Sequence, residues 1–402
     1  MPGRRDDRDA VIVGAVRTPI GKFGGALKEL RAHRLAALVM EEALRRAGVG
    51  GESLDEVIAG ECIQCPDEAN TARTAALAAG IPVEVPAYTV QKQCSSSMQA
   101  LASARAQIRA GEAEAILVVG VESMSSAPYV LKTARWGQRL THGEMTDSLW
   151  ELLNSGSRIL GQETIMGLTA ETLAARHGIS REAQDEVALR SHRNAEAAIR
   201  AGRFREEIVP VRITGRKGET VVDTDEHPRW GLTPEDLSRL PPAFQADGTV
   251  TAGNSSGLND GAAAALVLRR ARARELGLVP LGRVVAQASA GVAPEIMGYG
   301  PVPATRKLLD RTGVALGDIG LVELNEAFAA QYLACEADLG LDRERTNVNG
   351  SGIGLGHPVG ATGLRLVVSL LYEMRRRGVE LGLAALCVGG GMGMATLVEA
   401  EG

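Results

Sequence analysis

Aromatic side chains are scarce in this sequence. The 402 residues include four Phe, five Tyr and three Trp, which together make up 3% of the chain. The hydrophobic content of 45% comes mostly from Ala, Val, Leu and Ile, which are typical of buried parallel strands with helices packed closely over them. A chain of this length and composition can bury a large core made of two or three structural units.

Long apolar runs are also missing. No stretch of about 18 apolar residues occurs, so the sequence predicts no membrane-spanning helix and no membrane partner. The first ten residues, MPGRRDDRDA, are charged and lack the apolar centre of a signal peptide, and the final VEAEG is not a peroxisomal signal. We therefore expect a cytoplasmic protein.

Strong positive charge is absent as well. The formal net charge is −5 and the chain has no long cationic arm, so nucleic acid is not an expected partner. Five cysteines are too few for a disulfide framework in a chain of 402 residues. Cys62 and Cys65 form a C-x-x-C, but no second pair completes a zinc site and no thioredoxin-like context surrounds them, so we expect no metal.

The sequence repeats its own plan. A helix end, a Gly-rich turn and a short apolar strand occur at residues 43–63 and again, with the same spacing, at 308–328. The apolar stretch at 112–124 is echoed at 380–392, and each of these two strands follows a predicted helix. This alternation predicts an α/β fold with a largely parallel sheet, built as two similar halves with a site at the joint between them.

Residues 125–250 have a different character. Charged helical stretches alternate there with loops rich in Gly, Pro and Thr. We interpret this segment as an insertion that lies over the core and sets substrate specificity, with a separate third domain as the alternative. The predicted division is an N-terminal half at 1–124, completed by about 251–274, the inserted loop domain at 125–250, and a C-terminal half at 275–402.

Cys94 is the strongest catalytic candidate among the cysteines. It follows a strand-like segment and precedes a long predicted helix that opens with Ser95, Ser96 and Ser97 as N-cap residues. A thiol there faces free backbone N–H groups and the positive end of the helix dipole, and both lower its pKa. The sequence therefore predicts a reactive thiolate at Cys94, whereas Cys335 lies among apolar residues at helical spacing and is expected in the core.

Two further candidates lie in Gly-rich segments. Cys387 ends an apolar strand and enters four glycines within five residues. Such glycines let the backbone approach a ligand and present N–H groups to an oxyanion, although a tight turn beside a buried thiol also explains the pattern. His357 is fixed by Pro358 within a turn of glycines, an arrangement suited to a general base.

The remaining polar candidates are less specific. Asn325 and Glu326 stand between a predicted strand and a helix, where they either cap the helix or hold a water in a site. The other histidines are His33, His177 and His192, expected to be solvated beside charged helices, and His142 and His227 in polar loops.

Seven segments, in order along the chain, resemble the thiolase family. They are VRTPIGKFGG, QCSSSMQA around Cys94, GVESMSSAPY, TAGNSSGLNDGAA, NEAFAAQ, NVNGSGIGLGHPVGATG around His357, and CVGGGMG. The resemblance spans residues 10–399 and implies a five-layered αβαβα core of two duplicated halves plus an inserted loop domain. It also implies an acyltransferase that moves acyl groups reversibly between CoA thioesters, with no cofactor beyond these substrates.

The resemblance assigns roles at five positions. Cys94 matches the nucleophile that takes the acyl group as a thioester, and His357 matches the base that deprotonates it. Cys387 matches the second cysteine, which moves a proton to or from the α-carbon of acetyl-CoA. Asn325 matches the residue that holds a water in a first oxyanion hole beside His357, and the backbone N–H groups of Cys94 and Gly389 match a second hole.

Contacts to the substrate are also implied by the resemblance. Arg229 would lie near the nucleotide portion of CoA. The other residues implied along CoA and around the acyl end are Phe244, Ala252, Ser256, Leu258, Met166, Met297, Ala327 and Phe328.

The sequence departs from the family's pattern at three places. Ser97 stands where a glycine often follows the nucleophile, and we expect it to reshape the acyl pocket. Ile165 precedes Met166 and Gly167 where short-chain acetoacetyl-CoA thiolases often carry His-Met-Gly, which argues against strict acetoacetyl-CoA specificity. The third departure is ECIQCPDEANTAR, in place of a Gly-Gln-rich segment.

Two alternatives stay open at this point. A ketoacyl synthase-type condensing enzyme shares the fold, but it would use two histidines where this chain has His357 and Cys387. A catalytically silent acyl-CoA-binding scaffold subunit is the other alternative, against which the intact Cys94, His357 and Cys387 argue. The resemblance suggests a homodimer or a homotetramer.

Overall fold

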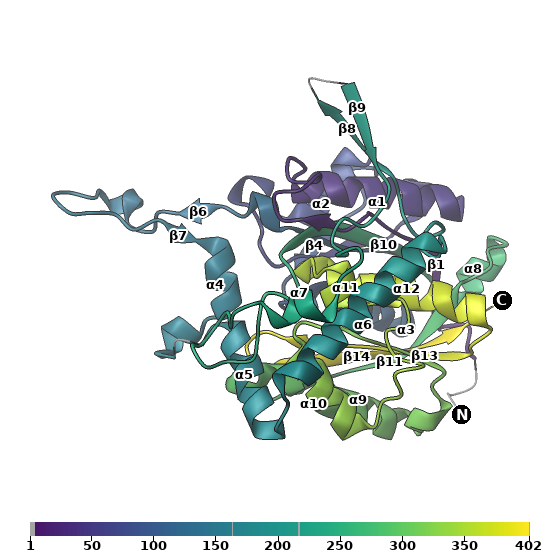
Figure 1. The fold of residues 1–402 in the computed structure, drawn as a ribbon. Helices are drawn as coiled ribbons and strands as arrows, with labels where there is room; N and C mark the ends of the chain where they lie inside the picture. Colours follow the sequence, from purple (N-terminus) through teal and green to yellow (C-terminus); the bar gives the residue numbers. More distant parts are fainter. Residues whose placement is uncertain (1–4, 163, 216–217, 402) are drawn as a thin grey trace.

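The computed structural model describes residues 5–162, 164–215 and 218–401. Figure 1 shows its secondary structure in five layers, helices alternating with sheet. The outer helices are α1 (Ala32–Ala47) and α2 (Thr71–Ala78) on one side and α9 (Pro301–Thr312) and α10 (Ala329–Leu339) on the other. The middle layer holds α3 (Ser96–Ala110) and α12 (Val359–Arg377). The predicted αβαβα architecture is therefore confirmed.

The two sheet layers belong to one hydrogen-bonded sheet with the order β12-β13-β14-β11-β1-β10-β5-β3-β4, and β2 pairs with β10. The strands are β1 (Ala10–Arg17), β2 (Gly21–Lys22), β3 (Glu56–Gly60), β4 (Ala87–Val90), β5 (Ala115–Ser123), β10 (Asn259–Arg269), β11 (Gly282–Gly291), β12 (Leu321–Leu324), β13 (Leu381–Val388) and β14 (Met392–Ala400). Two residue pairs, Val11 with Arg283 and Ile12 with Gly282, join β1 to β11. The sheet divides at this narrow junction into two half-sheets.

The half-sheets repeat one plan. Counted outward from the junction, the strands run β1-β10-β5-β3 in one half and β11-β14-β13-β12 in the other. Helices α3 and α12 precede β5 and β13, so they occupy equivalent places in the two halves. The structure thus bears out the duplication expected from the sequence.

The prediction of a largely parallel sheet was wrong. Pairs β3–β4, β3–β5 and β12–β13 are parallel, but the remaining neighbours are antiparallel. Strand β14 follows β13 after a turn of three glycines, so it can return only in the antiparallel direction. These strands are buried on both faces, so their sequences are continuously apolar. Such a run does not reveal whether a strand pairs with its neighbour in the parallel or the antiparallel direction.

Small residues allow α3 and α12 to lie between the half-sheets. A Cβ atom added to Gly363 of α12 would lie 2.7 Å from Cβ of Met98 on α3. A Cβ atom at Gly60 of β3 would lie 2.2 Å from the backbone of Ser96 and Ser97. Because real contacts of this kind are far longer, glycine is required here for the helices to reach their places. This packing fixes the starting points of α3 and α12, where two of the candidate catalytic residues are found.

The segment between β5 and β10 carries the helices and hairpins expected of an insertion. Its helices are α4 (Ser148–Asn154), α5 (Met166–His177), α6 (Arg181–Arg200) and α7 (Pro234–Ser238), and its hairpins are β6 (Tyr129–Val130) with β7 (Thr146–Asp147) and β8 (Val211–Gly215) with β9 (Gly218–Val222). Both hairpins project from the body in Figure 1. The domain limits drawn from the sequence stay a prediction, and residues 1–4 and 402 lie outside the described residues.

Short helices complete the fold, namely α8 (Arg270–Glu275) and α11 (Gly352–Leu355). Every described helix is too short or too polar to cross a bilayer.

Candidate active site

A cavity of about 410 Å³ lies beside the starts of α3 and α12. Three of the five predicted catalytic residues, Cys94, His357 and Cys387, line it. All the predicted substrate contacts line it too, namely Met166, Arg229, Phe244, Ala252, Ser256, Leu258, Met297, Ala327 and Phe328. The fold therefore gathers at one place residues that are spread over most of the sequence.

Cys94 and His357 hold equivalent places in the two halves. Cys94 directly precedes Ser95, the N-cap of α3, and His357 directly precedes Pro358, the N-cap of α12. Gln93, next to the nucleophile candidate, has a φ of 48°, a left-handed conformation that is uncommon outside glycine. The chain thus makes a sharp turn that brings Cys94 to the cavity.

The serines after Cys94 do not cap α3 with their side chains, contrary to the prediction. Ser95 Oγ donates to the carbonyl of Lys92 at 2.9 Å, and Ser96 Oγ donates to the carbonyl of Gln93 at 2.7 Å. Both hydroxyls therefore stabilise the turn before the helix rather than its first N–H groups.

The predicted low pKa of Cys94 was also wrong. Burial raises the pKa of this thiol to about 11, although the backbone N–H groups of Gly389 and of Cys94 itself act to lower the pKa. Removing the thiol from water disfavours the thiolate more than these donors favour it. The resting side chain is therefore a neutral thiol that needs a base before it can attack.

His357 is held in one tautomer. Thr362 Oγ1 donates its proton to the carbonyl of Pro358 at 2.9 Å, and it lies 2.7 Å from Nδ1 of His357. Since the single hydroxyl proton is already used, Oγ1 accepts from Nδ1–H. The lone pair is then on Nε2, the nitrogen that can take a proton.

The imidazole is also neutral. Burial and, to a smaller extent, the charge of Arg365 together lower the pKa of His357 to about 3. Asn325 Nδ2 lies 3.4 Å from Nε2 of the ring. Asn325 Oδ1 is buried and has no hydrogen-bond partner among the described residues, so this amide can still hold a small polar molecule beside the ring.

Cys387 and Gly389 come from the end of β13 and the turn that follows it. The turn can double back tightly because Gly390 and Gly391 have φ values of 84° and 89°. A Cβ atom at Gly389 would lie 2.5 Å from Oγ of Ser155 and 2.6 Å from Cε of Met166, so a larger residue would displace these two side chains. The Cys387 thiol is fully buried, and burial raises its pKa far above the usual range.

The outer part of the cavity is formed by the insertion and by the segment before β10. Arg229 Nη2 donates to the carbonyl of Ala252 at 3.3 Å, and the N–H of Ser256 donates to the carbonyl of Ala327 at 2.9 Å. The rings of Phe244 and Phe328 pack edge to face with centroids 6.1 Å apart. An exposed arginine at the mouth and an apolar interior suit a ligand with a charged and an apolar end.

Comparisons with known proteins match this arrangement over nearly the whole chain. Residues 10–271 match the thiolase N-terminal domain and residues 278–400 match the thiolase C-terminal domain. The acetyl-CoA acetyltransferase of Syntrophomonas wolfei is 49% identical over 98% of this chain and 99% of its own length. The chain belongs to the thiolase family.

Solved structures agree. That of the Bacillus anthracis acetyl-CoA acetyltransferase has a TM-score of 0.95 and 56% identity, with 98% of each chain covered. That of human mitochondrial 3-ketoacyl-CoA thiolase in complex with CoA has a TM-score of 0.93 and 42% identity, again with 98% of each chain covered. The prediction of a thiolase, an acyltransferase, is confirmed, and these findings do not favour either alternative.

Several residues that line the thiolase cavity were not predicted from the sequence. They are Met124, Leu153, Ala243, Ser255, Gly257 and Val359. Ile165 and Gly167, noted only as part of a departure from the family's pattern, line it as well. Nearly all of these are apolar or small residues, which carry no chemical signal of their own in the sequence.

Ser97 does not shape the acyl pocket, contrary to the prediction. Its Oγ accepts from the N–H of Leu364 on α12 at 2.9 Å, and a Cβ atom at Gly120 would lie 2.5 Å from its Cβ. The side chain therefore faces β5 and α12 rather than the thiolase cavity.

One other polar prediction needs correction. His192 is buried rather than solvated, and its Nδ1 accepts from the N–H of Arg229 at 3.2 Å. Of the two interpretations of Asn325 and Glu326, helix capping does not hold, because α10 starts at Ala329 without a side-chain cap. Glu326 instead accepts from Nδ2 of Asn347 at 2.7 Å inside the protein.

The C-x-x-C cysteines lie apart from any metal-binding group. Cys62 Sγ donates to the carbonyl of Gln93 at 3.0 Å, and Cys65 Sγ donates to the carbonyl of Ser126 at 3.4 Å. The described residues contain no group of three or more His, Cys, Asp and Glu side chains suited to a metal ion. Cys335 is fully buried in the core, as expected.

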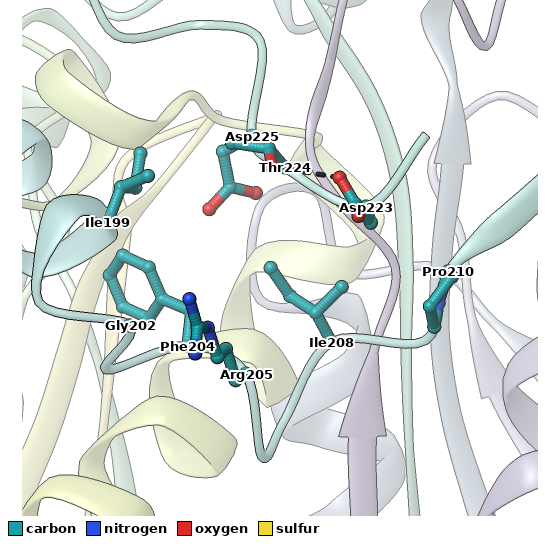
Figure 2. Close-up of a pocket in the computed structure, with 9 residues that line it drawn as sticks. All are labelled: Ile199, Gly202, Phe204, Arg205, Ile208, Pro210, Asp223, Thr224 and Asp225. Atoms are coloured by element: carbon teal, nitrogen blue, oxygen red, sulfur yellow. Dashed lines mark hydrogen bonds between the residues drawn. The ribbon is translucent and has the colours of Figure 1, made fainter. Parts of the chain in front are cut away.

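A separate pocket of about 340 Å³ lies where hairpin β8–β9 leaves the body of the thiolase (Figure 2). Asp225, which lines it, is already paired with the buried Arg17 at 2.7 Å. Phe204, on the opposite side in Figure 2, has its ring centroid 4.9 Å from Cζ of the same arginine. These groups serve to hold Arg17, and none of the predicted catalytic residues lines this pocket.

Proposed function

We propose that this thiolase cleaves and forms 3-ketoacyl-CoA through an acyl group carried on Cys94. The observation that supports this most directly is the meeting of Cys94, His357 and Cys387 in one cavity, with the N–H of Gly389 directed at the Cys94 sulfur. The substrates are acyl-CoA, acetyl-CoA and CoA, with no further cofactor.

In the first half-reaction, Nε2 of His357 takes the proton of the Cys94 thiol. The thiolate attacks C3 of the 3-ketoacyl-CoA, and the N–H groups of Cys94 and Gly389 stabilise the oxyanion. The bond between C2 and C3 breaks and leaves the enolate of acetyl-CoA. The enolate oxygen lies beside His357 and a water held by Asn325, and the Cys387 thiol protonates the α-carbon.

In the second half-reaction, the Cys387 thiolate takes the proton of the CoA thiol. The CoA thiolate attacks the Cys94 thioester, and acyl-CoA forms. Cys94 leaves as a thiolate and recovers its proton from the His357 imidazolium, so every proton returns to its place. The reverse sequence condenses acyl-CoA with acetyl-CoA, which is feasible because a thiolate is both a good nucleophile and a good leaving group.

The acyl group extends beyond two carbons in this proposal. Ile165, Met166 and Met297 line the acyl end of the cavity with apolar side chains. A smaller cavity of about 70 Å³ shares Met166 and Met297 with the main one. Since methionine is flexible and adapts to its neighbours, these two side chains can make room for a longer chain.

Self-association is part of the proposal. Strand β4 is the last strand of the sheet, and its residues are half-buried, so it offers an edge to a second copy. The arm formed by β6, β7 and the loop between them exposes Trp136, Leu140 and Met145. We propose a homo-oligomer, a dimer or a tetramer, located in the cytoplasm.

The decisive experiment is CoA-dependent cleavage of 3-ketoacyl-CoA substrates of four to sixteen carbons. We expect cleavage of the four-carbon substrate and higher kcat/KM for longer ones. Modification of Cys94 by iodoacetamide should be slowed by acetyl-CoA. No cleavage of any chain length, with Cys94 labelled at the same rate with and without acetyl-CoA, would overturn the proposed function.

A further inference from the structure

Arg365 is a buried cation near the catalytic residues. It lies on α12, three residues after Thr362, and its side chain is 2% exposed. Nη1 lies 3.8 Å from Oε2 of Glu323, whose side chain is 7% exposed. None of the guanidinium nitrogens has a hydrogen-bond partner among the described residues.

Other buried ion pairs in this protein have much better geometry. Arg17 Nη1 lies 2.7 Å from Oδ1 of Asp225, and Arg283 Nε lies 2.5 Å from Oε2 of Glu399, both within hydrogen-bonding distance. A buried pair without hydrogen bonds recovers little of the free energy lost when two charges leave water. Stability alone therefore gives a poor account of Arg365 at this position.

The location of the pair gives a better account. Glu323 lies in β12, two residues before Asn325. Arg365 lies in the helix whose first turn contains Thr362, the hydroxyl that accepts from His357 Nδ1–H. The pair therefore bridges the strand that leads to Asn325 and the helix that holds His357.

We propose that Arg365 and Glu323 are positioning residues that hold Asn325 and His357 in register by joining the end of β12 to the first turns of α12. The inference rests on the proposed function, because it concerns the residues that the mechanism uses around the enolate oxygen. Neither residue touches the substrate in this proposal. Their effect passes through the 3.4 Å contact between Asn325 Nδ2 and His357 Nε2.

The charge of Arg365 adds a second effect on the same base. It lowers the pKa of His357, in the same direction as burial. Cys94 and Cys387, both neutral thiols at rest, line the same cavity as the ring. Glu122 accepts from the N–H of Gly360 in the first turn of α12, and burial raises the pKa of Glu323 to about 8 although Arg365 acts to lower it. Together with burial, the charge of Arg365 keeps the resting imidazole neutral, which is the form that can accept the Cys94 proton.

The test compares Arg365→Met, Arg365→Lys and Glu323→Gln with the wild-type enzyme. Arg365→Met should lower kcat for thiolysis about 10²-fold with little change in KM for CoA, since small misplacements of catalytic groups have effects of this size. The pKa of His357, followed by NMR of ¹³Cε1-labelled histidine, should rise by about one unit in Arg365→Met, as expected on losing a nearby charge. The pKa of His357 should not rise in Arg365→Lys or Glu323→Gln, because a cation remains at position 365 in both variants. The kcat for thiolysis should nevertheless fall in both.

The matched control is Arg283→Met, which breaks a buried ion pair away from the cavity. It should lower the melting temperature while leaving kcat and the pKa of His357 unchanged. The positioning role is overturned if Arg283→Met loses activity as Arg365→Met does, or if the Lys and Gln variants keep wild-type kcat. If Arg365→Met does not fold, the kcat values of Arg365→Lys and Glu323→Gln test the positioning role. A wild-type enzyme that never acylates Cys94 overturns the proposed function instead.

Discussion

The hydroxyl of Thr362 lies 2.7 Å from Nδ1 of His357 and gives its own proton to the carbonyl of Pro358. A residue one helical turn into α12 thereby decides which nitrogen of the ring is the base. The same ring is buried and neutral, with its pKa lowered to about 3. Deprotonation of the Cys94 thiol thus depends on the Thr362 hydroxyl, because this hydroxyl fixes the tautomer of His357, although it does not itself line the cavity.

Replacing that hydroxyl tests the relationship. Thr362→Val keeps the shape of the side chain but removes the acceptor for Nδ1–H, so the proton is free to move to Nε2 and block the base. We expect acylation of Cys94 to slow by about 10² to 10⁴, the usual contribution of a positioned base. Rapid-quench measurement of acyl-enzyme formation checks this. Thr362→Ser keeps the hydroxyl and should stay within a few-fold of wild type; equal loss in both variants would contradict the tautomer argument.

Variants of Cys387 and Cys94 should distinguish acyl transfer to Cys94 from the making and breaking of the carbon–carbon bond. Cys387→Ala removes the acid that protonates the enolate but leaves Cys94 and its N–H donors in place. Transfer of an acetyl group from acetyl-CoA to Cys94 should survive at a reduced rate, because CoA is a good leaving group as a thiolate even when Cys387 cannot protonate it. Cleavage and condensation of the carbon–carbon bond should stop, because the α-carbon has no other acid or base. Mass spectrometry of the acylated protein and the condensation assay give the two readouts. Cys94→Ser, the control, should lose the acyl-enzyme altogether; equal loss of both half-reactions in Cys387→Ala would refute its assigned role.

Chain-length preference should respond to the two methionines shared by the main and the smaller cavity. Met297→Ala should join the two spaces and raise kcat/KM for eight- to ten-carbon substrates relative to the four-carbon substrate. A gain of about tenfold corresponds to two buried methylene groups at about 0.8 kcal/mol each. Leu153→Ala is the matched control, since Leu153 lines only the main cavity of the two. The same preference in both variants would show that the smaller cavity takes no part.

Glu61 predicts an unusual pH dependence of stability. Burial and the nearby Glu122 raise its pKa from 4.5 to about 9, although the hydroxyl of Thr71 acts to lower this pKa. The folded protein thus keeps a proton that the unfolded chain releases above about pH 4.5, so stability falls as pH rises from there towards 9.

Glu61→Gln should therefore raise the melting temperature at pH 8 and change it little at pH 5, as measured by calorimetry. Glu42 provides a control of opposite sign, because its pKa is lowered to about 2, with a hydrogen bond from Arg45 as the largest cause that lowers it. Glu42→Gln should lower the melting temperature slightly at pH 8. A gain in Glu61→Gln that is the same at both pH values would contradict the proposed ionisation.

Much of the fold and the main site residues could be predicted because their signals are local. The duplicated strand and helix patterns, the glycines around Cys387 and His357, and the order of the family segments all lie in short stretches of sequence. The structure brings the predicted substrate contacts to one cavity, including Arg229 and Met166 from the insertion.

The errors concern quantities set by distant parts of the chain. The direction of β10 and β14 depends on their connections and not on their own composition. The pKa of Cys94 was predicted from its own helix, but burial by the surrounding fold has the larger effect. Ser97 was expected in the pocket because it neighbours Cys94, yet its direction is set by Leu364 from the other half of the molecule.

The equivalent places of Cys94 and His357 bear on how such an enzyme can arise. Each is the residue before the N-cap of the matching helix, one in each half. A single ancestral half could offer either an attacking atom or a proton acceptor at that point, but not both. With two copies of the plan in one chain, one copy presents the attacking atom and the other the proton acceptor, so the chemistry depends on the duplication.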